Sequence, residues 1–362
     1  MIGIGILVGT GTLRSLQRGD SDPRLEALLR ANEQVAEELG IELFFFTLDA
    51  VNFQRQRIKG TYKVQGKWRQ KLFSYPHALY RRFSMTEGDR VVHAALLRQL
   101  RAQGTVFLNY QIKMNKWEIH QCLLLSQSLI EYLPPTRLIT SDQELWNFLA
   151  ENPTTYLKAC VGGRGKQVMR VEGSGKEGFT FAKFDRRLIQ GRLSWLGLAR
   201  TINDFFGGAP YIAQRGIQLL QVNGRHIDFR AEVQRGKLGE IRVAAIPVRI
   251  ARDQSPITTH SMTMAVEEFA LHNPELIPNY KEFHAQAKEF LSSFYMAVEG
   301  CFGRCGELGI DFALDRQGKW WFIEANAQSA KVSFFKSYPE ESIAQSFISL
   351  LEYAQFLVQE IK

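Results

Sequence analysis

Several features that mark other classes of protein are missing from this chain of 362 residues and 41.4 kDa. No run of about 18 apolar residues occurs, which argues against a transmembrane helix. The four cysteines are too few for a disulfide scaffold at this length, so we expect a reducing compartment and a cytoplasmic location. The apolar start lacks the basic region and the cleavage pattern of a signal peptide, and we therefore interpret residues 2–8 as a first strand.

Acidic residues are absent from residues 50–86, although the net charge of the whole chain is +8. The same stretch holds nine basic residues: Arg55, Arg57, Lys59, Lys63, Lys67, Arg69, Lys71, Arg81 and Arg82. This basic block at residues 55–82 favours an anionic partner, such as nucleic acid, an acidic surface or a polyanion. It is also typical of a solvated hairpin with basic decoration, and charge pattern alone identifies no partner.

The hydrophobic pattern of the first third indicates a parallel α/β layer. Strands at residues 2–8 and 41–48 flank a helix at 24–39, which Gly40 ends. A strand–helix–strand start of this kind is typical of parallel sheets. With a short strand at 106–108, the first domain is expected to end near residue 112. A chain of this length favours two or three domains.

Beyond residue 112 the pattern changes from helices to strands and back. We expect helices at 116–132 and 142–150, and then strands at 155–160, 167–171 and 211–214. Alternating strands follow up to about residue 250. The last third predicts a long helix, a hairpin and a closing amphipathic helix, over residues 279–299, 310–326 and 340–361.

The hairpin at residues 310–326 carries polar residues in otherwise apolar strands. Gln317-Gly318 is a plausible two-residue turn, with glycine where a positive φ is needed. In that register Arg316 pairs with Lys319, and Asp311 lies directly across from Glu324.

Asn326 is two residues beyond Glu324, so the two side chains share one face of the strand. Cross-strand neighbours lie about 5 Å apart at Cβ, which brings Asp311 close to them. Two carboxylates and one amide oxygen suit Mg²⁺, a cation that often completes its shell with water and phosphate. The alternative is a hairpin with polar residues on its solvated face.

A glycine-rich turn and two lysines are further candidates for phosphate contacts. Lys158 lies on the strand that enters the turn containing Gly162, Gly163 and Gly165, where backbone N–H groups can approach an anion closely. The turn lacks the Gly-Lys-Ser/Thr ending of a Walker loop. Lys116 stands at the start of the helix predicted at 116–132. A lysine at this position, taken alone, is also typical of a solvated helix start.

Taken together, these motifs resemble the ATP-grasp superfamily. The order matches over nearly the whole chain, through Lys116, Tyr156-Leu157-Lys158, Tyr211-Ile212-Ala213-Gln214-Arg215-Gly216-Ile217, Asp228-Phe229-Arg230, Glu307-Leu308-Gly309-Ile310-Asp311 and Phe322-Ile323-Glu324-Ala325-Asn326. Within the superfamily the chain looks most like the YheC/YheD group, described as endospore coat-associated. Supporting stretches outside the ATP site are Gly66-Lys67-Trp68, Phe107-Leu108-Asn109, Asn115-Lys116-Trp117 and Leu133-Pro134-Pro135-Thr136.

The resemblance implies a multidomain fold of the α/β and α+β classes. An N-terminal Rossmann-like domain, the pre-ATP-grasp domain, would cover residues 1–112. A central ATP-grasp subdomain with the glycine-rich loop would cover 113–213, and a C-terminal subdomain with the magnesium hairpin 214–362.

The resemblance also implies a carboxylate–amine ligase that uses ATP and Mg²⁺ and passes through an acyl phosphate. ATP would contact Lys116, Lys158, Gly162, Gly163, Gly165, Gln214, Arg215, Gly216 and Ile217. The metal ligands would be Asp311, Glu324 and Asn326. Arg230, and less directly Arg249, would bind the acyl phosphate or the γ-phosphate. The substrates would be a small-molecule or peptide carboxylate and an amine.

Two departures from the group keep a second function open. The loop strand has Ala159 where the group tends to have proline, and residues 249–264 lack its Thr-Asn and Gly-Gly pairs. The alternative is a nucleotide-binding protein with a structural role in a spore layer and no turnover. No Ser-His-Asp or Cys-His signature competes with these interpretations, and the oligomeric state is not predicted.

Overall fold

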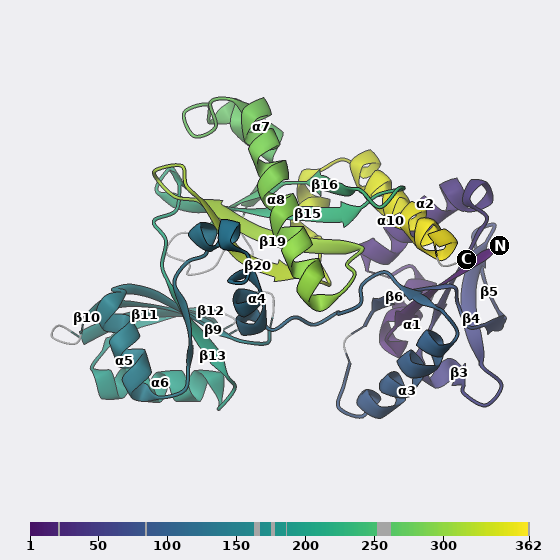
Figure 1. The fold of residues 1–362 in the computed structure, drawn as a ribbon, viewed down its shortest axis with the longest axis horizontal. Coiled ribbons are helices and arrows are strands. Elements are labelled where there is room, and N and C mark those ends of the chain that lie inside the picture. Colours follow the sequence, from purple (N-terminus) through teal and green to yellow (C-terminus); the bar gives the residue numbers. More distant parts are fainter. Residues whose placement is uncertain are drawn as a thin grey trace.

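The computed structural model describes residues 1–20, 22–83, 85–162, 167–174, 178–185, 187–251 and 262–360. Within these ranges the strands form three sheets, which we call the N-terminal, central and C-terminal sheets after their order along the chain. Figure 1 shows the central sheet with its helices set apart from a larger body that contains the other two sheets.

The N-terminal sheet is the parallel α/β layer expected from the hydrophobic pattern. Its strand order is β3-β4-β2-β1-β6-β7, and β5 pairs with β4. Parallel pairing joins β2, β1, β6 and β7, whereas β3, β4 and β5 pair antiparallel. The strands are β1 (Ile2–Val8), β2 (Ile41–Phe46), β3 (Val51–Asn52), β4 (Arg57–Val64), β5 (Lys67–Ser74), β6 (Ala78–Arg82) and β7 (Val106–Phe107).

Helices α1 (Thr10–Arg18), α2 (Pro23–Leu39) and α3 (Asp89–Ala102) and the 3₁₀ turn η1 (Leu48–Ala50) complete this layer. The predicted helix at 24–39 is confirmed as α2. Asp22 accepts a hydrogen bond from the Arg24 amide at its start, and Gly40 ends it with a left-handed φ of 62°.

The central sheet is antiparallel throughout, in the order β12-β11-β10-β9-β13-β8. Its strands are β8 (Thr136–Ile139), β9 (Thr154–Ala159), β10 (Val168–Ser174), β11 (Gly178–Asp185), β12 (Arg187–Leu193) and β13 (Tyr211–Arg215). Helices α5 (Asp142–Glu151) and α6 (Trp195–Phe206) pack against it and share a core with it.

The helix predicted at residues 116–132 is wrong as a single element. The structure has α4 (Lys116–Leu123) and a separate 3₁₀ segment, η2 (Gln127–Tyr132). A continuous helix would extend the buried face of Ile119 and Leu123 to Ile130. The break instead turns the chain so that Leu129 is buried and Ile130 is exposed.

The C-terminal sheet has the order β18-β17-β15-β19-β20, and β14 and β16 also pair with β15. Its strands are β14 (Gln221–Val222), β15 (Arg225–Arg235), β16 (Ile241–Ala245), β17 (Pro247–Ile250), β18 (Met262–Ala265), β19 (Glu307–Leu314) and β20 (Trp320–Asn326). The helices that follow or separate them are α7 (Val266–His272), α8 (Tyr280–Phe302), α9 (Val332–Ser337) and α10 (Glu340–Glu360).

The two faces of the C-terminal sheet differ sharply. Residues at one set of alternate positions, such as Phe229, Ile310 and Phe312, join the core that α8 covers. The other positions are polar, and on β15 they are Asp228, Arg230, Glu232 and Gln234. Since side chains alternate along a strand, this places the charged residues of neighbouring strands on one common face.

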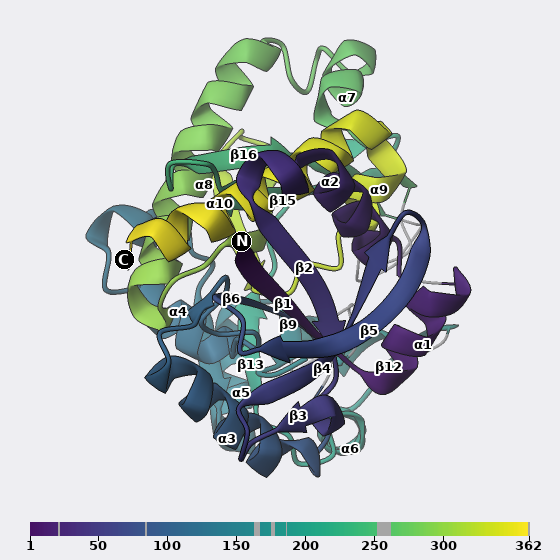
Figure 2. The ribbon, with the colours of Figure 1, turned by 90° about the vertical axis from the view of Figure 1, so that its right-hand side faces the viewer.

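The N-terminal and C-terminal sheets share a hydrophobic core through α9 and α10. Phe334, Phe347 and Leu350 from these helices belong to the same buried cluster as Ile4 and Ile6 of β1. Figure 2 shows α10 lying beside α2 over the N-terminal sheet. The division into a domain at residues 1–112 and two subdomains at 113–213 and 214–362 stays a proposal.

A disulfide joins Cys122 on α4 to Cys301 on α8, across 179 residues of sequence. The expectation that all the cysteines stay reduced is therefore wrong for this pair, because packing of α4 against α8 brings together two residues far apart in sequence. Cys160 and Cys305 are buried thiols. No helix within the described ranges combines the length and apolarity needed to cross a membrane.

Candidate functional site

The predicted pairing of Asp311 with Glu324 is confirmed by the register of β19 and β20. Asn326 lies opposite Gly309, two residues further along the same face. All three predicted metal-binding residues therefore lie on the polar face of the C-terminal sheet, with Asp311 and Glu324 as direct neighbours.

The predicted turn of this hairpin is wrong by one residue. The Asp315 amide donates to the Lys319 carbonyl, so Arg316 does not pair with Lys319, and a bulge between Asp311 and Phe312 restores the register. The physical reason is the Asp315 carboxylate, which accepts hydrogen bonds from the amides of Gln317 and Lys319 and from the indole N–H of Trp321.

Two arginines hold the Asp311 carboxylate. Its Oδ1 lies 2.8 Å from Nε of Arg230 and 3.2 Å from Nη2 of Arg249, as ion pairs without well-aligned hydrogen bonds. Arg249 also donates to both carboxylate oxygens of Asp228, at 2.6 and 2.9 Å. Burial alone would lower the pKa of Arg249, but the carboxylates of Asp228 and Asp311 outweigh it and raise that pKa.

Lys116 reaches the other carboxylate of the pair. Its Nζ lies 3.4 Å from Oε1 of Glu324 and donates to the carbonyl of Gly162 at 3.2 Å. The Asn115 side chain caps α4 by accepting from the Trp117 amide, which fixes Lys116 at the first turn. Lys116 therefore links the C-terminal sheet to the start of the glycine-rich turn. Gly163 and Gly165 lie outside the described residues.

Lys158 is buried beside the same carboxylates. Its Nζ donates to Oε1 of Gln214 at 2.6 Å, and Nε2 of Gln214 donates to the Thr136 hydroxyl at 3.0 Å. Burial lowers the pKa of Lys158 to about 8, against the opposing attraction of Glu324 and with the help of the positive charge on Lys116.

A pocket between the central and C-terminal sheets brings several predicted residues together. Of the predicted set, Lys116, Lys158, Gln214 and Glu324 line it. The stretch Leu133-Pro134-Pro135-Thr136 was placed outside the ATP site from the sequence, and the structure corrects this, since Leu133, Pro134 and Thr136 line the pocket. Ile212, Phe322, Ile323 and Ala325 belong to the quoted motifs but were given no contact, and sequence reasoning missed Ile119 and His120 of α4. His120 lies one helical turn after Lys116, and this i to i+4 spacing could have found it.

The predicted hinge residues after Gln214 do not line this pocket. The guanidinium of Arg215 lies over the ring of Trp321, 5.7 Å from its centroid. Gly216 packs so tightly that an added Cβ would lie 2.5 Å from Cγ2 of Thr154. Contacts of Arg215, Gly216 and Ile217 with a nucleotide stay predictions, as does a role for Asn326.

The donor set fits a divalent cation of the hard, oxygen-binding kind. Across the described ranges, no three histidine, cysteine, aspartate or glutamate side chains gather as a metal cluster, so the proposed metal site relies on the carboxylate pair Asp311 and Glu324. Two carboxylates and a nearby amide are the ligands expected for Mg²⁺. Four cations (Lys116, Lys158, Arg230 and Arg249) face three carboxylates (Asp228, Asp311 and Glu324), so the site also suits an anion.

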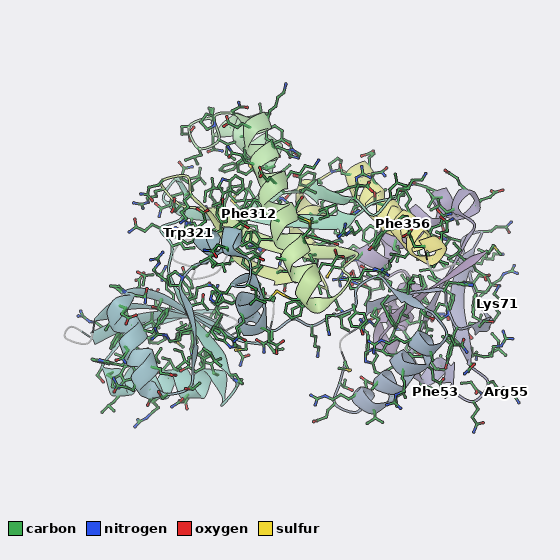
Figure 3. The ribbon with its side chains drawn as sticks, in the orientation of Figure 1. Phe53, Arg55, Lys71, Phe312, Trp321 and Phe356 are labelled. Carbon is green, nitrogen blue, oxygen red and sulfur yellow. A yellow bond between two sulfur atoms is a disulfide. The ribbon has the colours of Figure 1, made fainter. Side chains whose placement is uncertain are left out.

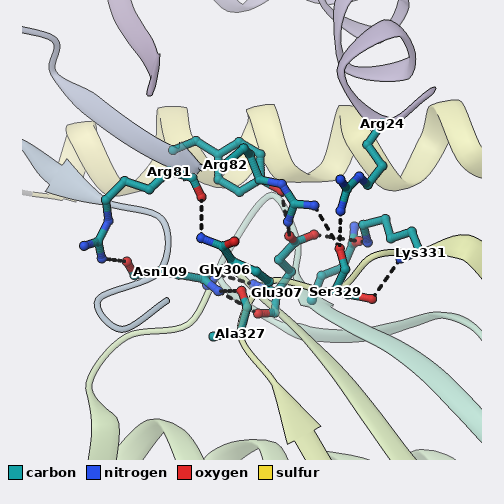
Figure 4. Close-up of polar contacts among 12 residues, drawn as sticks. Arg24, Arg81, Arg82, Asn109, Gly306, Glu307, Ala327, Ser329 and Lys331 are labelled. Atoms are coloured by element: carbon teal, nitrogen blue, oxygen red, sulfur yellow. Dashed lines mark hydrogen bonds and ion pairs between the residues drawn. The ribbon is translucent and has the colours of Figure 1, made fainter. Parts of the chain in front are cut away.

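A second charged cluster, which we call the inner cluster, lies further along the same polar face. Glu232 and Glu307 each contact Nζ of Lys331, at 3.2 and 3.1 Å, and Glu307 also pairs with Arg82 at 3.2 Å. The Tyr80 hydroxyl donates to Glu307 at 2.6 Å. Figure 4 shows this network at the junction between β6 and the C-terminal sheet.

Solved structures match the fold over nearly the whole chain. The D-alanine–D-alanine ligase from Coxiella burnetii matches with a TM-score of 0.53 at 11% identity, covering 99% of this chain and 98% of that one. The ATP-grasp ligase PsnB, solved with a minimal precursor, Mg and ADP, matches with a TM-score of 0.51 at 13% identity, covering 96% and 97%. The fold is therefore that of ATP-grasp proteins.

The family follows from the sequence itself. The model of the YheC/D-like ATP-grasp family matches residues 104–357, and the chain belongs to that family. The endospore coat-associated protein YheD of Bacillus subtilis (strain 168) is 26% identical over 380 residues, which cover 99% of this chain and 80% of YheD. The resemblance drawn from the motifs is confirmed.

Proposed function

We propose that this protein is an ATP- and magnesium-dependent ligase that joins a carboxylate to an amine and releases ADP. The observation that carries the proposal is the cross-strand pair Asp311 and Glu324, contacted by cations from three other elements, with Glu324 lining a pocket that buried Lys158 also lines.

Each charged residue has a role in this proposal. Lys116 and Lys158 neutralise phosphate oxygens, while Gly162 and the rest of the glycine-rich turn contribute backbone N–H groups. Asp311, Glu324 and Asn326 would hold Mg²⁺, which supplies positive charge that stabilises a transferring phosphoryl group. Arg230 and Arg249 bind the γ-phosphate or the acyl phosphate made from it.

The proposed reaction has two substitutions. A substrate carboxylate oxygen attacks the γ-phosphorus, the bond to the β-phosphate oxygen breaks, and ADP leaves with formation of an acyl phosphate. An amine then attacks the acyl carbon, phosphate leaves and the nitrogen loses a proton. None of these steps needs a nucleophilic side chain. The substrate is a small molecule or a peptide.

A second function is favoured by one specific observation, the name of the relative YheD as an endospore coat-associated protein. In that case the chain binds nucleotide, takes a structural role in a spore layer and does not turn over. A cytoplasmic location and association with the spore are both compatible with the two functions. The acceptor-side segment that would bear on turnover includes residues 252–261, which lie outside the described residues.

The test of both functions is the thermal stability of the protein with ATP and Mg²⁺. Ligand at about 100 times its Kd should stabilise the native state by roughly 2.7 kcal/mol. We expect this shift in wild type and in the control Asp204→Asn/Glu341→Gln, which removes two exposed charges elsewhere. We expect little shift in Asp311→Asn/Glu324→Gln.

ADP release then separates the ligase from the binder. Wild type is incubated with pooled amino acids and peptides, and ADP and new amide products are measured by mass spectrometry. A thermal shift without ADP release would support the second function, nucleotide binding without turnover. No wild-type shift with ATP and Mg²⁺ would eliminate both.

A further inference from the structure

The antiparallel hairpin of β4 and β5 forms one side of the N-terminal sheet. All eight residues of β5 pair with β4, and no other described strand pairs with β5. Its outer edge therefore presents unpaired backbone N–H and C=O groups. Figure 1 shows β5 at the right-hand rim of the molecule, beyond β4.

Most of the basic block belongs to this hairpin, but its last two members do not. Arg81 and Arg82 are buried, where Arg81 donates to the carbonyls of Asn109 and Tyr110 and Arg82 pairs with Glu307. The surface available to a partner is therefore residues 55–71. Figure 3 shows Arg55 and Lys71 at the outer rim of the molecule, far from Phe312 and Trp321 in the C-terminal sheet.

The charge of the hairpin is only partly neutralised from within. Lys71 pairs with Glu42, and Lys63 lies 3.9 Å from Glu33. Lys59, Lys67 and Arg69 are exposed, and no ion pair joins them to an acidic residue in the described part of the chain. These three cations are therefore available to an anionic partner.

The spacing of the cations on β5 matches an extended polypeptide. Lys67, Arg69 and Lys71 lie at alternate positions of one strand and so share a face, with a repeat of about 7 Å. A strand added at the free edge presents its own side chains with the same repeat. On the opposite face of β5, Leu72 is 66% exposed and lies directly across from Lys59, which offers an apolar contact as well.

We propose that the edge of β5 binds an extended acidic segment of another polypeptide, which adds to the N-terminal sheet as a strand. Backbone pairing along the edge gives affinity, and acidic side chains at alternate positions pair with Lys67 and Arg69, which lie on one face of β5 and make no ion pair within the described part of the chain. The free backbone edge favours a polypeptide over a nucleic acid, which has no donors and acceptors arranged to continue a sheet.

This docking surface is separate from the proposed ligase site. Residues 55–71 lie outside residues 104–357, which the family model matches. The pocket lies between the other two sheets and contains none of the hairpin residues. Binding at β5 should therefore not depend on ATP or Mg²⁺, so this proposal and the ligase proposal fail independently.

The test is fluorescence anisotropy of the full-length protein with a labelled peptide in which glutamate alternates with threonine. At low ionic strength we expect saturable binding that weakens as salt is added. Lys67→Glu/Arg69→Glu should weaken it by about tenfold or more, because attraction becomes repulsion at two positions. The control Lys237→Glu/Lys288→Glu makes the same charge change at exposed sites elsewhere and should bind like wild type.

Two further probes separate strand addition from simple charge attraction. A peptide of the same sequence with N-methyl groups at alternate amides keeps its charge but cannot pair along the edge, and we expect it to bind much more weakly. Equal binding of the methylated peptide, or tighter binding of a single-stranded RNA, would overturn the proposal. So would equal weakening by both charge variants, or an absence of peptide binding at low ionic strength.

Discussion

One face of the C-terminal sheet carries two charged clusters that contain the same kinds of residue but differ in access to ligands. The inner cluster consists of Arg82, Glu232, Glu307 and Lys331. The outer cluster, which lies at the candidate site, consists of Lys116, Arg230, Arg249, Asp311 and Glu324. Strands β15 and β19 contribute to both, since Arg230 and Glu232 lie two residues apart.

The two clusters differ in burial and in how well their polar atoms are paired. Side-chain exposure is 1–4% for the inner ion pairs, whereas it is 10–19% for the pairs that Asp311 and Glu324 make with Arg230 and Lys116. Nη1 of Arg230 is buried without a hydrogen-bond partner, while Glu307 contacts three donors. The inner charges are therefore committed to the fold, and the outer ones keep capacity for a ligand.

The pKa shifts distinguish the ion-paired residues of both clusters from Lys158, which lies in the candidate site but outside the outer cluster. Burial would lower the pKa of Arg249 in the outer cluster, but carboxylates raise it, as in the inner cluster. Burial alone would raise the pKa of Glu307, yet Lys331 and Arg82 outweigh it and hold that pKa low. Burial alone would lower the pKa of Lys331, yet Glu307 and Glu232 raise it. At Lys158, in the candidate site, burial prevails instead and lowers the pKa. A lysine near the point of losing its proton is one that a bound anion can stabilise.

The largest effect that would test this comparison is the loss of Lys331. Lys331→Met leaves Glu232 and Glu307 buried without their shared cation and should lower the free energy of unfolding by about 3–5 kcal/mol. Denaturant unfolding without ligand measures it. Lys336→Met, which removes an exposed lysine from α9, the short helix that begins directly after Lys331, should change stability by less than about 0.5 kcal/mol.

In the same assay Asp311→Asn should cost clearly less than Lys331→Met. Arg249 keeps Asp228 as a partner after this change, and the side chains of the outer pairs are partly exposed to solvent. Equal losses in the two clusters would remove the distinction between them.

The next effect concerns the disulfide between Cys122 and Cys301. Cys122 lies on the helix that carries Lys116, so its bond to Cys301 ties one side of the outer cluster to α8. Cys122→Ser/Cys301→Ser should lower the free energy of unfolding by about 2–4 kcal/mol, because the bond closes a long loop. Unfolding is measured with and without a reductant. The reductant should destabilise wild type and leave the double variant unchanged, and equal curves for all four samples would contradict the pairing.

A smaller effect is expected at Gly309, which lies between the two clusters. An added Cβ would lie 2.6 Å from Nη1 of Arg230 and 2.9 Å from Oγ of Ser329. Gly309→Ala should therefore cost about 1–3 kcal/mol, because both the Arg230 guanidinium and the Ser329 hydroxyl must move. Gly11→Ala, where nothing lies within 4 Å of the added carbon, is the matched control. Unchanged stability in Gly309→Ala would show that the boundary between the clusters is loose.

The smallest effect is a pH dependence of nucleotide affinity. Since Lys158 has its pKa lowered to about 8, it is charged below that pH and loses its proton above it. Phosphate oxygens bind the charged form, so the Kd for ATP with Mg²⁺ should rise above pH 8 by up to about tenfold per pH unit, or 1.4 kcal/mol. Calorimetric titration across this range measures it. Lys158→Arg does not titrate there and should flatten the profile, and a flat wild-type profile would contradict the assignment.

Local patterns predicted most of the secondary structure. The strand at 2–8 and the helices at 24–39 and 142–150 follow from apolar periodicity with capping residues, which depends only on neighbouring positions. The break between α4 and η2 could not be predicted in this way, because it depends on tertiary packing that buries Leu129, and not Ile130, in the C-terminal core. The packing of α10 on α2 is likewise a contact between the two ends of the chain.

The candidate site divides along the same line. Asp311 and Glu324 were predicted as neighbours because one hairpin joins them. The turn was predicted one residue out of register, but the bulge between Asp311 and Phe312 compensates for this shift, so Asp311 still pairs with Glu324. The contact of Lys116 with Glu324 joins segments remote in sequence, and no spacing rule predicts it. The inner cluster was not predicted at all, and Arg82 was counted with the exposed basic block.

The sequence by itself determined the family, the order of the strands and helices, and the residue types that can bind a phosphate and a divalent cation. Those properties reside in short stretches whose neighbours are fixed by the chain. Only the tertiary structure decided which of several similar charges became buried ion pairs and which stayed at the candidate site. Burial and ion-pair partners depend on segments that meet only after folding. Arginine and glutamate residues therefore form buried structural ion pairs in one cluster and partly exposed pairs in the other.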